Sequence, residues 1–155
     1  MRTAPADFAD PRVIALLRHH LESARAETAP GSAHALDPTG LQAPGIEAWT
    51  MWDADGTLMA IGALKSVSAI HGEVKSMHTA GAARRRGVGG AMLRHIIAAA
   101  RATGMRRLSL ETGSWPYFAS AHALYAAHGF VECGPFEGYG PDPNSIFMTL
   151  DLPAA

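Results

Sequence analysis

Residues 73–100 read EVKSMHTAGAARRRGVGGAMLRHIIAAA, and three different patterns follow one another in this stretch. The first seven residues alternate and predict a strand with two distinct faces. One face would carry Val74, Ser76 and His78, and the other Glu73, Lys75, Met77 and Thr79. An arginine- and glycine-rich loop follows. From Ala91 onward, apolar residues recur at helical spacing. The stretch therefore predicts a strand, a basic loop and a helix.

The loop combines the features of an anion-binding site. The first N–H groups of a helix have no partner within the helix, and the helix dipole places partial positive charge there. Glycines let an anion approach the main chain, and arginines add charge and forked donors that suit phosphate. We therefore predict that the loop binds phosphate through Arg84, Arg85, Arg86, Gly87, Val88, Gly89 and Gly90. The alternative is a solvated basic turn before a surface helix.

Two common phosphate-binding motifs do not fit this loop. It has no Gly-Lys-Ser or Gly-Lys-Thr, and the third glycine of a dinucleotide fingerprint is out of register. The pattern Arg84-x-x-Gly87-x-Gly89 instead resembles the Arg/Gln-x-x-Gly-x-Gly/Ala signature of the GCN5-related N-acetyltransferases. A second stretch, ALYAAHGF at residues 123–130, is similar to the helix and turn that this family writes A-x-x-L-Y-x-x-x-G-F. The resemblance covers about residues 45–150.

The expected architecture is α/β (α+β), in one domain spanning residues 1–155. Strands at 46–52, 57–65 and 73–80 would form an antiparallel meander. Strand 73–80, helix 89–102 and strand 107–112 would form a right-handed β-α-β unit. Further elements are expected at 1–6, 11–27, 117–128, 130–132 and 146–150. The resemblance implies a three-layer fold with a mixed, mostly antiparallel sheet of about 6–7 strands, a central splayed parallel pair and helices on both faces.

The resemblance also implies acetyl-CoA as the acyl donor. In the family, the arginine- and glycine-rich loop holds the pyrophosphate, and the strand before it pairs with the pantetheine arm. That strand position corresponds to Met77, His78 and Thr79. A main-chain N–H of the same strand can polarise the thioester oxygen.

Tyr125 is the candidate general acid. It matches the family tyrosine that lies near the coenzyme A sulfur. A phenol has a pKa of about 10, so it is protonated at neutral pH and can donate to a departing thiolate. The alternative is a tyrosine that only packs in the core.

The general base is left open between Glu73 and Glu111, with His78 ranked below them. An amine must lose a proton before it attacks, and both glutamates lie on central strands where burial without partners is costly. Glu73 could instead pair with Lys75, and Glu111 could serve a structural network. Strand parity does not decide, because a bulge in the central strand would reverse the faces.

The expected acceptor is a primary amine of a small molecule or of an amino-acid-like compound. Residues placed near the acceptor are Trp115, Tyr117, Phe136 and Tyr139, with His34 and Asp37 as weaker candidates. Two alternatives remain: a module that senses acyl-CoA without catalysis, and an acyltransferase that uses a longer acyl donor or modifies a protein lysine.

Composition and charge disfavour several other classes of protein. The net charge of −1 and the single basic loop disfavour a nucleic-acid binder. The lone Cys133 excludes an intrachain disulfide, and no apolar run suggests a membrane span. We expect a cytoplasmic protein, with a homodimer through edge strands implied by the resemblance. No metal site is expected, since the histidines lack ligand spacing; His71 and His78, seven apart, should face opposite sides.

Overall fold

The computed structural model describes residues 1–28, 34, 36–84 and 86–153. Within them, seven strands form one sheet in the order β1-β2-β3-β4-β5-β7-β6. The strands are β1 (Arg2–Pro5), β2 (Ile46–Trp52), β3 (Leu58–Ser66), β4 (His71–Thr79), β5 (Arg107–Gly113), β6 (Val131–Cys133) and β7 (Ser145–Asp151). The α-helices are α1 (Pro11–Ala26), α2 (Val88–Ala102) and α3 (Ala119–Ala127), and the short 3-10 turns are η1 (Gly40–Gln42), η2 (Gly81–Ala83) and η3 (Pro116–Phe118).

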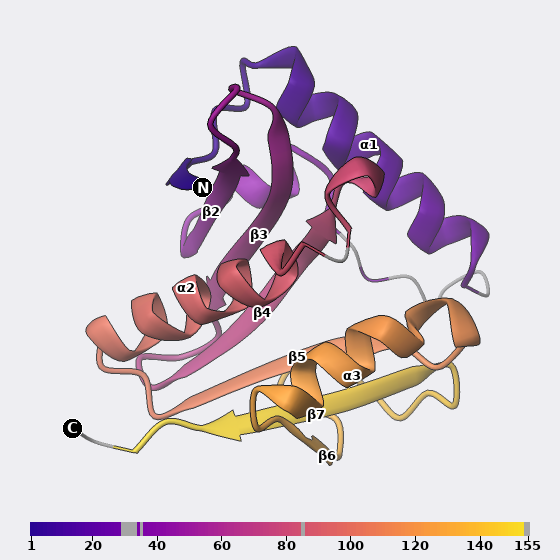
Figure 1. Ribbon diagram of the computed structural model, residues 1–155. Coiled ribbons are helices and arrows are strands. Elements are labelled where there is room, and N and C mark those ends of the chain that lie inside the picture. The colour runs from indigo at the N-terminus through magenta and orange to yellow at the C-terminus, as the bar shows by residue number, and fades with distance from the viewer. Residues whose placement is uncertain (29–33, 35, 85, 154–155) are drawn as a thin grey trace.

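The arrangement confirms the expected fold class. β1 to β4 pair antiparallel in sequence, and β4 and β5 are joined through α2 and run parallel. The helices lie on both faces of the sheet, with α1 on one side and α2 and α3 on the other (Figure 1). Along β3 the apolar residues alternate between the two sides. Ile61 belongs to the cluster under α1, and Ala60 and Leu64 belong to the cluster under α2 and α3.

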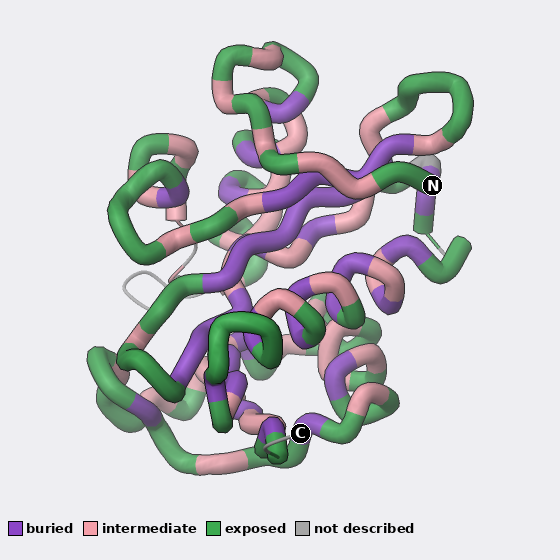
Figure 2. Tube along the Cα trace, turned by 90° about the vertical axis from the view of Figure 1, so that its left-hand side faces the viewer, coloured by how far each residue is buried: buried purple, intermediate pink, exposed green. Residues whose placement is uncertain are grey.

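Local sequence explains why α1 and α2 form where they do. Asp10 caps α1 by accepting a 2.9 Å hydrogen bond from the Arg12 amide, and proline follows at the first helical position. Val13 and Leu17 of α1 are fully buried. The α2 face predicted from the spacing is also buried, with Met92, Leu93, Ile96, Ile97 and Ala100 all among the buried residues. Figure 2 shows the buried residues, in purple, along the central strands and at intervals along the helices.

The two parallel strands separate soon after they begin. Their pairing covers only His71–Glu73 on β4 and Arg107–Ser109 on β5. Beyond that point the strands diverge, which is visible in Figure 1 as an opening between β4 and β5. The implied splay is therefore confirmed, and it opens the sheet on the side where the arginine- and glycine-rich loop lies.

A β-bulge in β4 corrects the predicted strand faces. Ile61 lies opposite His78, but Ala63 lies opposite Lys75, so Ser76 and Met77 together face one residue of β3. Ser76 has a φ of 55°. The extra residue reverses the alternation after Ser76. His78 therefore shares a face with Lys75 and Glu73, on the α1 side, and Met77 packs on the α2 side.

The same bulge overturns the prediction that His71 and His78 face opposite sides, since one extra residue between them restores a common face. Element ends moved by only a few residues: α2 begins at Val88, ahead of the predicted start, and β4 begins at His71. The sequence also allows a short helical turn at residues 32–36, of which residues 32, 33 and 35 lie outside the described residues. None of the helices among the described residues is long and apolar enough to cross a membrane.

Candidate active site

A pocket of about 650 Å³ opens where β4 and β5 separate. Its walls come from the end of β4, the loop before α2, the end of β5, η3 and α3, with α1 closing one side. Its lining includes Tyr125, Glu73, Glu111, Met77, His78, Thr79, Arg84, Gly87, Val88, Gly89 and Gly90. The three candidate catalytic residues and most of the candidate cofactor residues thus lie around one cavity.

The loop before α2 has the geometry of an anion site. Gly87 is the residue before the helix and has a φ of 76°, a conformation that side-chain-bearing residues rarely adopt. The first helical bond runs from the Ala91 amide to the Gly87 carbonyl at 3.1 Å, so the amides of residues 88–90 precede the first donor of the helix and have no acceptor within it. A Cβ on Gly89 would lie 3.3 Å from Leu124. Glycine at position 89 therefore allows α2 and α3 to pack closely at Leu124.

The three arginines of the loop are not equivalent. Arg84 is exposed and lines the pocket. Arg86 is exposed but is not part of the lining. Arg85 was predicted to bind the cofactor and lies outside the described residues. Of the described arginines in this loop, Arg84 is therefore the one that lines the pocket.

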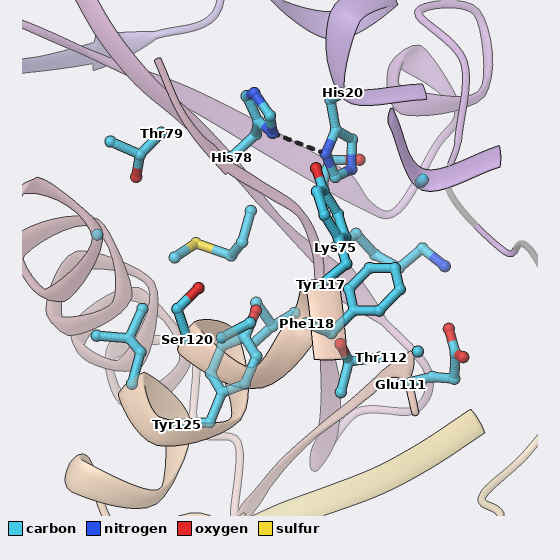
Figure 3. Close-up of a pocket in the computed structure, with 18 of the residues that line it drawn as sticks. His20, Lys75, His78, Thr79, Glu111, Thr112, Tyr117, Phe118, Ser120 and Tyr125 are labelled. Atoms are coloured by element: carbon cyan, nitrogen blue, oxygen red, sulfur yellow. Dashed lines mark hydrogen bonds between the residues drawn. The ribbon is translucent and has the colours of Figure 1, made fainter. Parts of the chain in front are cut away.

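Tyr125 projects from α3 toward the pocket, and its hydroxyl points inward (Figure 3). The side chain is 7% exposed, and its ring lies 5.8 Å from that of Phe130. Burial, with a smaller contribution from the charge of Glu111, raises the pKa of Tyr125 well above that of a free phenol. Tyr125 is therefore a protonated donor throughout the neutral range.

Glu73 is buried in a closed set of polar contacts. Its Oε2 accepts a 2.6 Å hydrogen bond from the Tyr139 hydroxyl and lies 3.4 Å from Lys75 Nζ. Lys75 Nζ also donates to the Tyr139 oxygen and to the His34 carbonyl, both at 3.1 Å. We call Glu73, Lys75, Tyr139 and the His34 carbonyl the lysine clasp. It joins β4 to the segment after α1 and to the loop before β7.

Glu111 has a different environment. It lies on β5 opposite Phe147 of β7, is partly buried and lines the pocket near Thr112 (Figure 3). Burial is the largest influence on its carboxyl group and raises its pKa above the ordinary value. A carboxylate with a raised pKa is a stronger base than an ordinary glutamate, so Glu111 has the electrostatics that proton abstraction requires.

Two histidines meet across the α1 side of the pocket. Nδ1 of His20 lies 3.1 Å from Nδ1 of His78, a contact that needs one ring to donate and the other to accept (Figure 3). Burial lowers the pKa of His20 to about 4 and that of His78 to about 3, with smaller contributions from neighbouring histidines. Both rings are therefore neutral at physiological pH.

The other predicted acceptor residues fall into two groups. Tyr117 and His34 line the pocket. Asp37 is not part of the pocket lining, and its side chain accepts a 2.6 Å hydrogen bond from the Gly40 amide. Phe136 packs edge-on against Tyr139, and neither Phe136 nor Trp115 is part of the pocket lining.

Two sets of contacts at the pocket were not predicted from the sequence. The first is the contact of His20 with His78, although the helical spacing of His20 from Val13 and Leu17 could have indicated a ring that faces the sheet. Lys75 was considered only as a partner of Glu73. That pairing is correct, but the roles of Tyr139 and His34 depend on contacts 64 and 41 residues apart in sequence. Among the described residues, no group of three histidine, cysteine or acidic side chains is arranged to hold a metal ion.

Comparison with known proteins agrees with this geometry. The model of the Acetyltransferase (GNAT) family matches residues 14–130. The chain belongs to this family. It is 44% identical over 146 residues to YsnE of Bacillus subtilis strain 168, named an uncharacterized N-acetyltransferase, covering 94% of this chain and 96% of that protein. It is 41% identical over 122 residues to the IAA acetyltransferase of Azospirillum brasilense, covering 78% of each chain.

The fold is shared with a Bacillus subtilis acetyltransferase solved in complex with CoA, at a TM-score of 0.66, 16% identity, and 97% and 98% coverage of the two chains. The protein is thus a GNAT acetyltransferase, and acetyl-CoA is the acyl donor of this family.

Proposed function

We propose that this acetyltransferase acts as a single domain that transfers the acetyl group of acetyl-CoA to a primary amine of a small molecule, with Tyr125 as general acid and Glu111 as general base. The observation that carries the proposal is the position of these two side chains around one pocket, on α3 and β5, beside the loop before α2. The phosphates of the coenzyme would bind the amides of residues 88–90 and Arg84. The thioester arm would follow Met77, His78 and Thr79 into the opening between β4 and β5.

Glu111 is preferred to Glu73 because the two carboxylates differ in their partners. Glu73 accepts from Tyr139 and faces the ammonium of Lys75, so both partners hold its carboxylate within the lysine clasp. Burial raises the pKa of Glu111, which makes its carboxylate a stronger base than an ordinary glutamate. Glu73 is therefore proposed as a positioning residue, which holds the lysine clasp and does not take the proton.

The proposed reaction transfers one acyl group and balances its protons. The amine nitrogen attacks the thioester carbonyl carbon while Glu111 accepts a proton from that nitrogen, directly or through a water. A main-chain N–H of β4 near the bulge would stabilise the oxyanion. The C–S bond then breaks, and Tyr125 donates its hydroxyl proton to the departing thiolate. Tyr125 regains its proton from solvent and Glu111 releases its own, so the enzyme is unchanged.

The identity of the acceptor is a separate question. One relative is named an IAA acetyltransferase, so IAA is assayed beside the primary amines as a competing acceptor from another chemical class. An acyl-CoA sensor and a protein-lysine acyltransferase remain alternatives from other classes. A homodimer through the edge strands β1 or β6 and a cytoplasmic location stay predictions.

The donor site is tested by isothermal titration of acetyl-CoA into the wild type and into Gly87→Glu. Gly56→Glu is the matched control, because Gly56 also has a positive φ, 78°, but lies in the hairpin between β2 and β3. We expect Gly87→Glu to lose binding and Gly56→Glu to retain it. Binding that survives in Gly87→Glu would mean that the phosphates do not bind at this loop.

A further inference from the structure

The distribution of charge in the acceptor half of the pocket limits which amines fit there. We define the acceptor half as the side of the pocket lined by Lys75, Glu111, His34, Tyr117 and Phe118, away from the loop before α2. Among the described lining residues, the side chains with a fixed positive charge are Lys75 and Arg84. Arg84 stands beside the phosphate loop, so Lys75 is the cation that an acceptor would approach.

Lys75 has no donor left for a ligand. An ammonium group has three N–H donors. Those of Lys75 have acceptors in the His34 carbonyl at 3.1 Å, the Tyr139 oxygen at 3.1 Å and Glu73 Oε2 at 3.4 Å. Its side chain is 9% exposed, and that of Glu73 is 4% exposed. The Lys75 charge is therefore compensated within the clasp and is mostly covered by protein.

The histidines on the α1 side add no positive charge. His20 and His78 are held in their neutral forms by burial, which lowers the pKa of each far below physiological pH. Their Nδ1 atoms bond to each other, which leaves one Nε2 edge on each ring. A ligand carboxylate in the acceptor half would thus meet no unpaired cation among these side chains. A buried carboxylate without an ionic partner is strongly disfavoured.

The same region suits an amine with an apolar body. Glu111 provides a negative charge for an arriving ammonium group. Tyr117, 39% exposed, and the partly buried Phe118 line the wall beside it, with their rings 4.9 Å apart and edge to face. Aromatic walls bind apolar groups through burial of surface and ring contacts.

We propose that the acceptor is a primary amine with an apolar or aromatic body and without a carboxylate beside the amine. This inference rests on the proposed function. It narrows the expected acceptors, which were small-molecule or amino-acid-like amines, to amines that lack an α-carboxylate. The lysine clasp produces the selectivity, because it already pairs Lys75, the fixed cation that the described residues place in the acceptor half.

The test uses pairs of acceptors that differ only in the α-carboxylate: 2-phenylethylamine against L-phenylalanine, and 3-methylbutylamine against L-leucine. Release of coenzyme A thiol and formation of the acetylated product give kcat/KM for each. We expect the amine without the carboxylate to be preferred by at least about 10-fold in each pair, equivalent to about 1.4 kcal/mol. Equal use, or preference for the amino acid, would overturn the proposal.

A variant tests the role of the clasp directly. Tyr139→Phe removes one acceptor of Lys75 and should reduce the preference in each pair, because an N–H of Lys75 becomes available to a carboxylate. Tyr117→Phe is the control; it removes a hydroxyl from the pocket wall and leaves the three partners of Lys75 in place. A preference that is unchanged in Tyr139→Phe would contradict the role given to the clasp.

The outcome separates this inference from the proposed function. If acetyl-CoA binds but no amine of either pair is acetylated, the acceptor class is wrong and the donor site stands. If acetyl-CoA does not bind to the wild type, the proposed function fails and this inference fails with it.

Discussion

The Tyr139 hydroxyl donates a 2.6 Å hydrogen bond to Oε2 of Glu73, and this contact joins the loop before β7 to the first half of the central strand β4. The two residues are 66 positions apart in the chain. Because the bond involves a charged acceptor and is largely shielded from water, it is among the stronger contacts at the site. Glu73 therefore belongs to the architecture of the pocket.

Tyr139→Phe should destabilise the fold by about 1–3 kcal/mol, because the buried Glu73 carboxylate loses a donor and Lys75 loses an acceptor. The free energy of unfolding from urea denaturation measures this change. Tyr117→Phe, which removes a hydroxyl from a more exposed tyrosine, should change it by less than about 0.5 kcal/mol. Equal free energies of unfolding in the two variants would show that the Tyr139 hydroxyl in the lysine clasp does not stabilise the fold.

Glu111→Gln should chiefly lower activity, whereas Glu73→Gln should chiefly lower stability. Removing the base should lower kcat/KM of Glu111→Gln by about 10²–10⁴-fold, with little change in stability. Glu73→Gln should chiefly lower stability, since it leaves Lys75 with a weaker partner in a buried site. Steady-state kinetics and urea denaturation on both variants distinguish the roles. A loss of activity confined to Glu73→Gln would identify Glu73 as the base.

The pH dependence of kcat/KM should show an acid limb from Glu111. The carboxylate form takes the proton, so activity falls as the pH drops through the pKa of this group in the folded protein. Burial raises that pKa, and the limb should therefore lie above the ordinary glutamate value of 4.5. The limb should disappear from the residual activity of Glu111→Gln. An identical limb in this variant would assign the titration to another group.

Acid should destabilise the fold through His20 and His78. Their pKa values in the folded protein, about 4 and about 3, lie below the ordinary 6.5. Between these limits the unfolded chain binds more protons, so the stability present above about pH 6.5 is lost as the pH falls toward 4. Between pH 7 and pH 4, the midpoint temperature of thermal unfolding should fall less steeply in His78→Gln than in the wild type. His19→Gln changes an exposed ring that contacts His78 and makes only a smaller contribution to the lowered pKa values, so it should alter the pH profile less than His78→Gln does.

Much of this molecule could be predicted from sequence because the signals were local. The alternation at the start of β4 and the apolar face of α2 each lie within a few residues, and the helices and strands formed within a few positions of their expected ranges. The arginine- and glycine-rich loop and the Tyr125 helix line one pocket because β4 and β5 run parallel, so the segments that follow the two strands lie at the same edge of the sheet.

The features that could not be predicted from the sequence depended on contacts between residues that are far apart in the chain. The bulge at Ser76 inserts one residue against β3, and nothing in the alternation of residues 73–79 indicates where it falls. It changed the face of His78 and thereby its partner. The choice between Glu73 and Glu111 likewise depended on Tyr139, which reaches β4 from a loop without regular secondary structure.

The most direct test of the proposed mechanism is Tyr125→Phe, which removes the hydroxyl and keeps the ring that packs against Phe130. Titration of acetyl-CoA and the steady-state rate with an accepted amine are measured on the same preparation. We predict that the dissociation constant of acetyl-CoA stays near that of the wild type while kcat falls by about 10²–10⁴-fold, the range typical of a lost general acid. An unchanged kcat in Tyr125→Phe would contradict the assignment of Tyr125 as the proton donor to the thiolate.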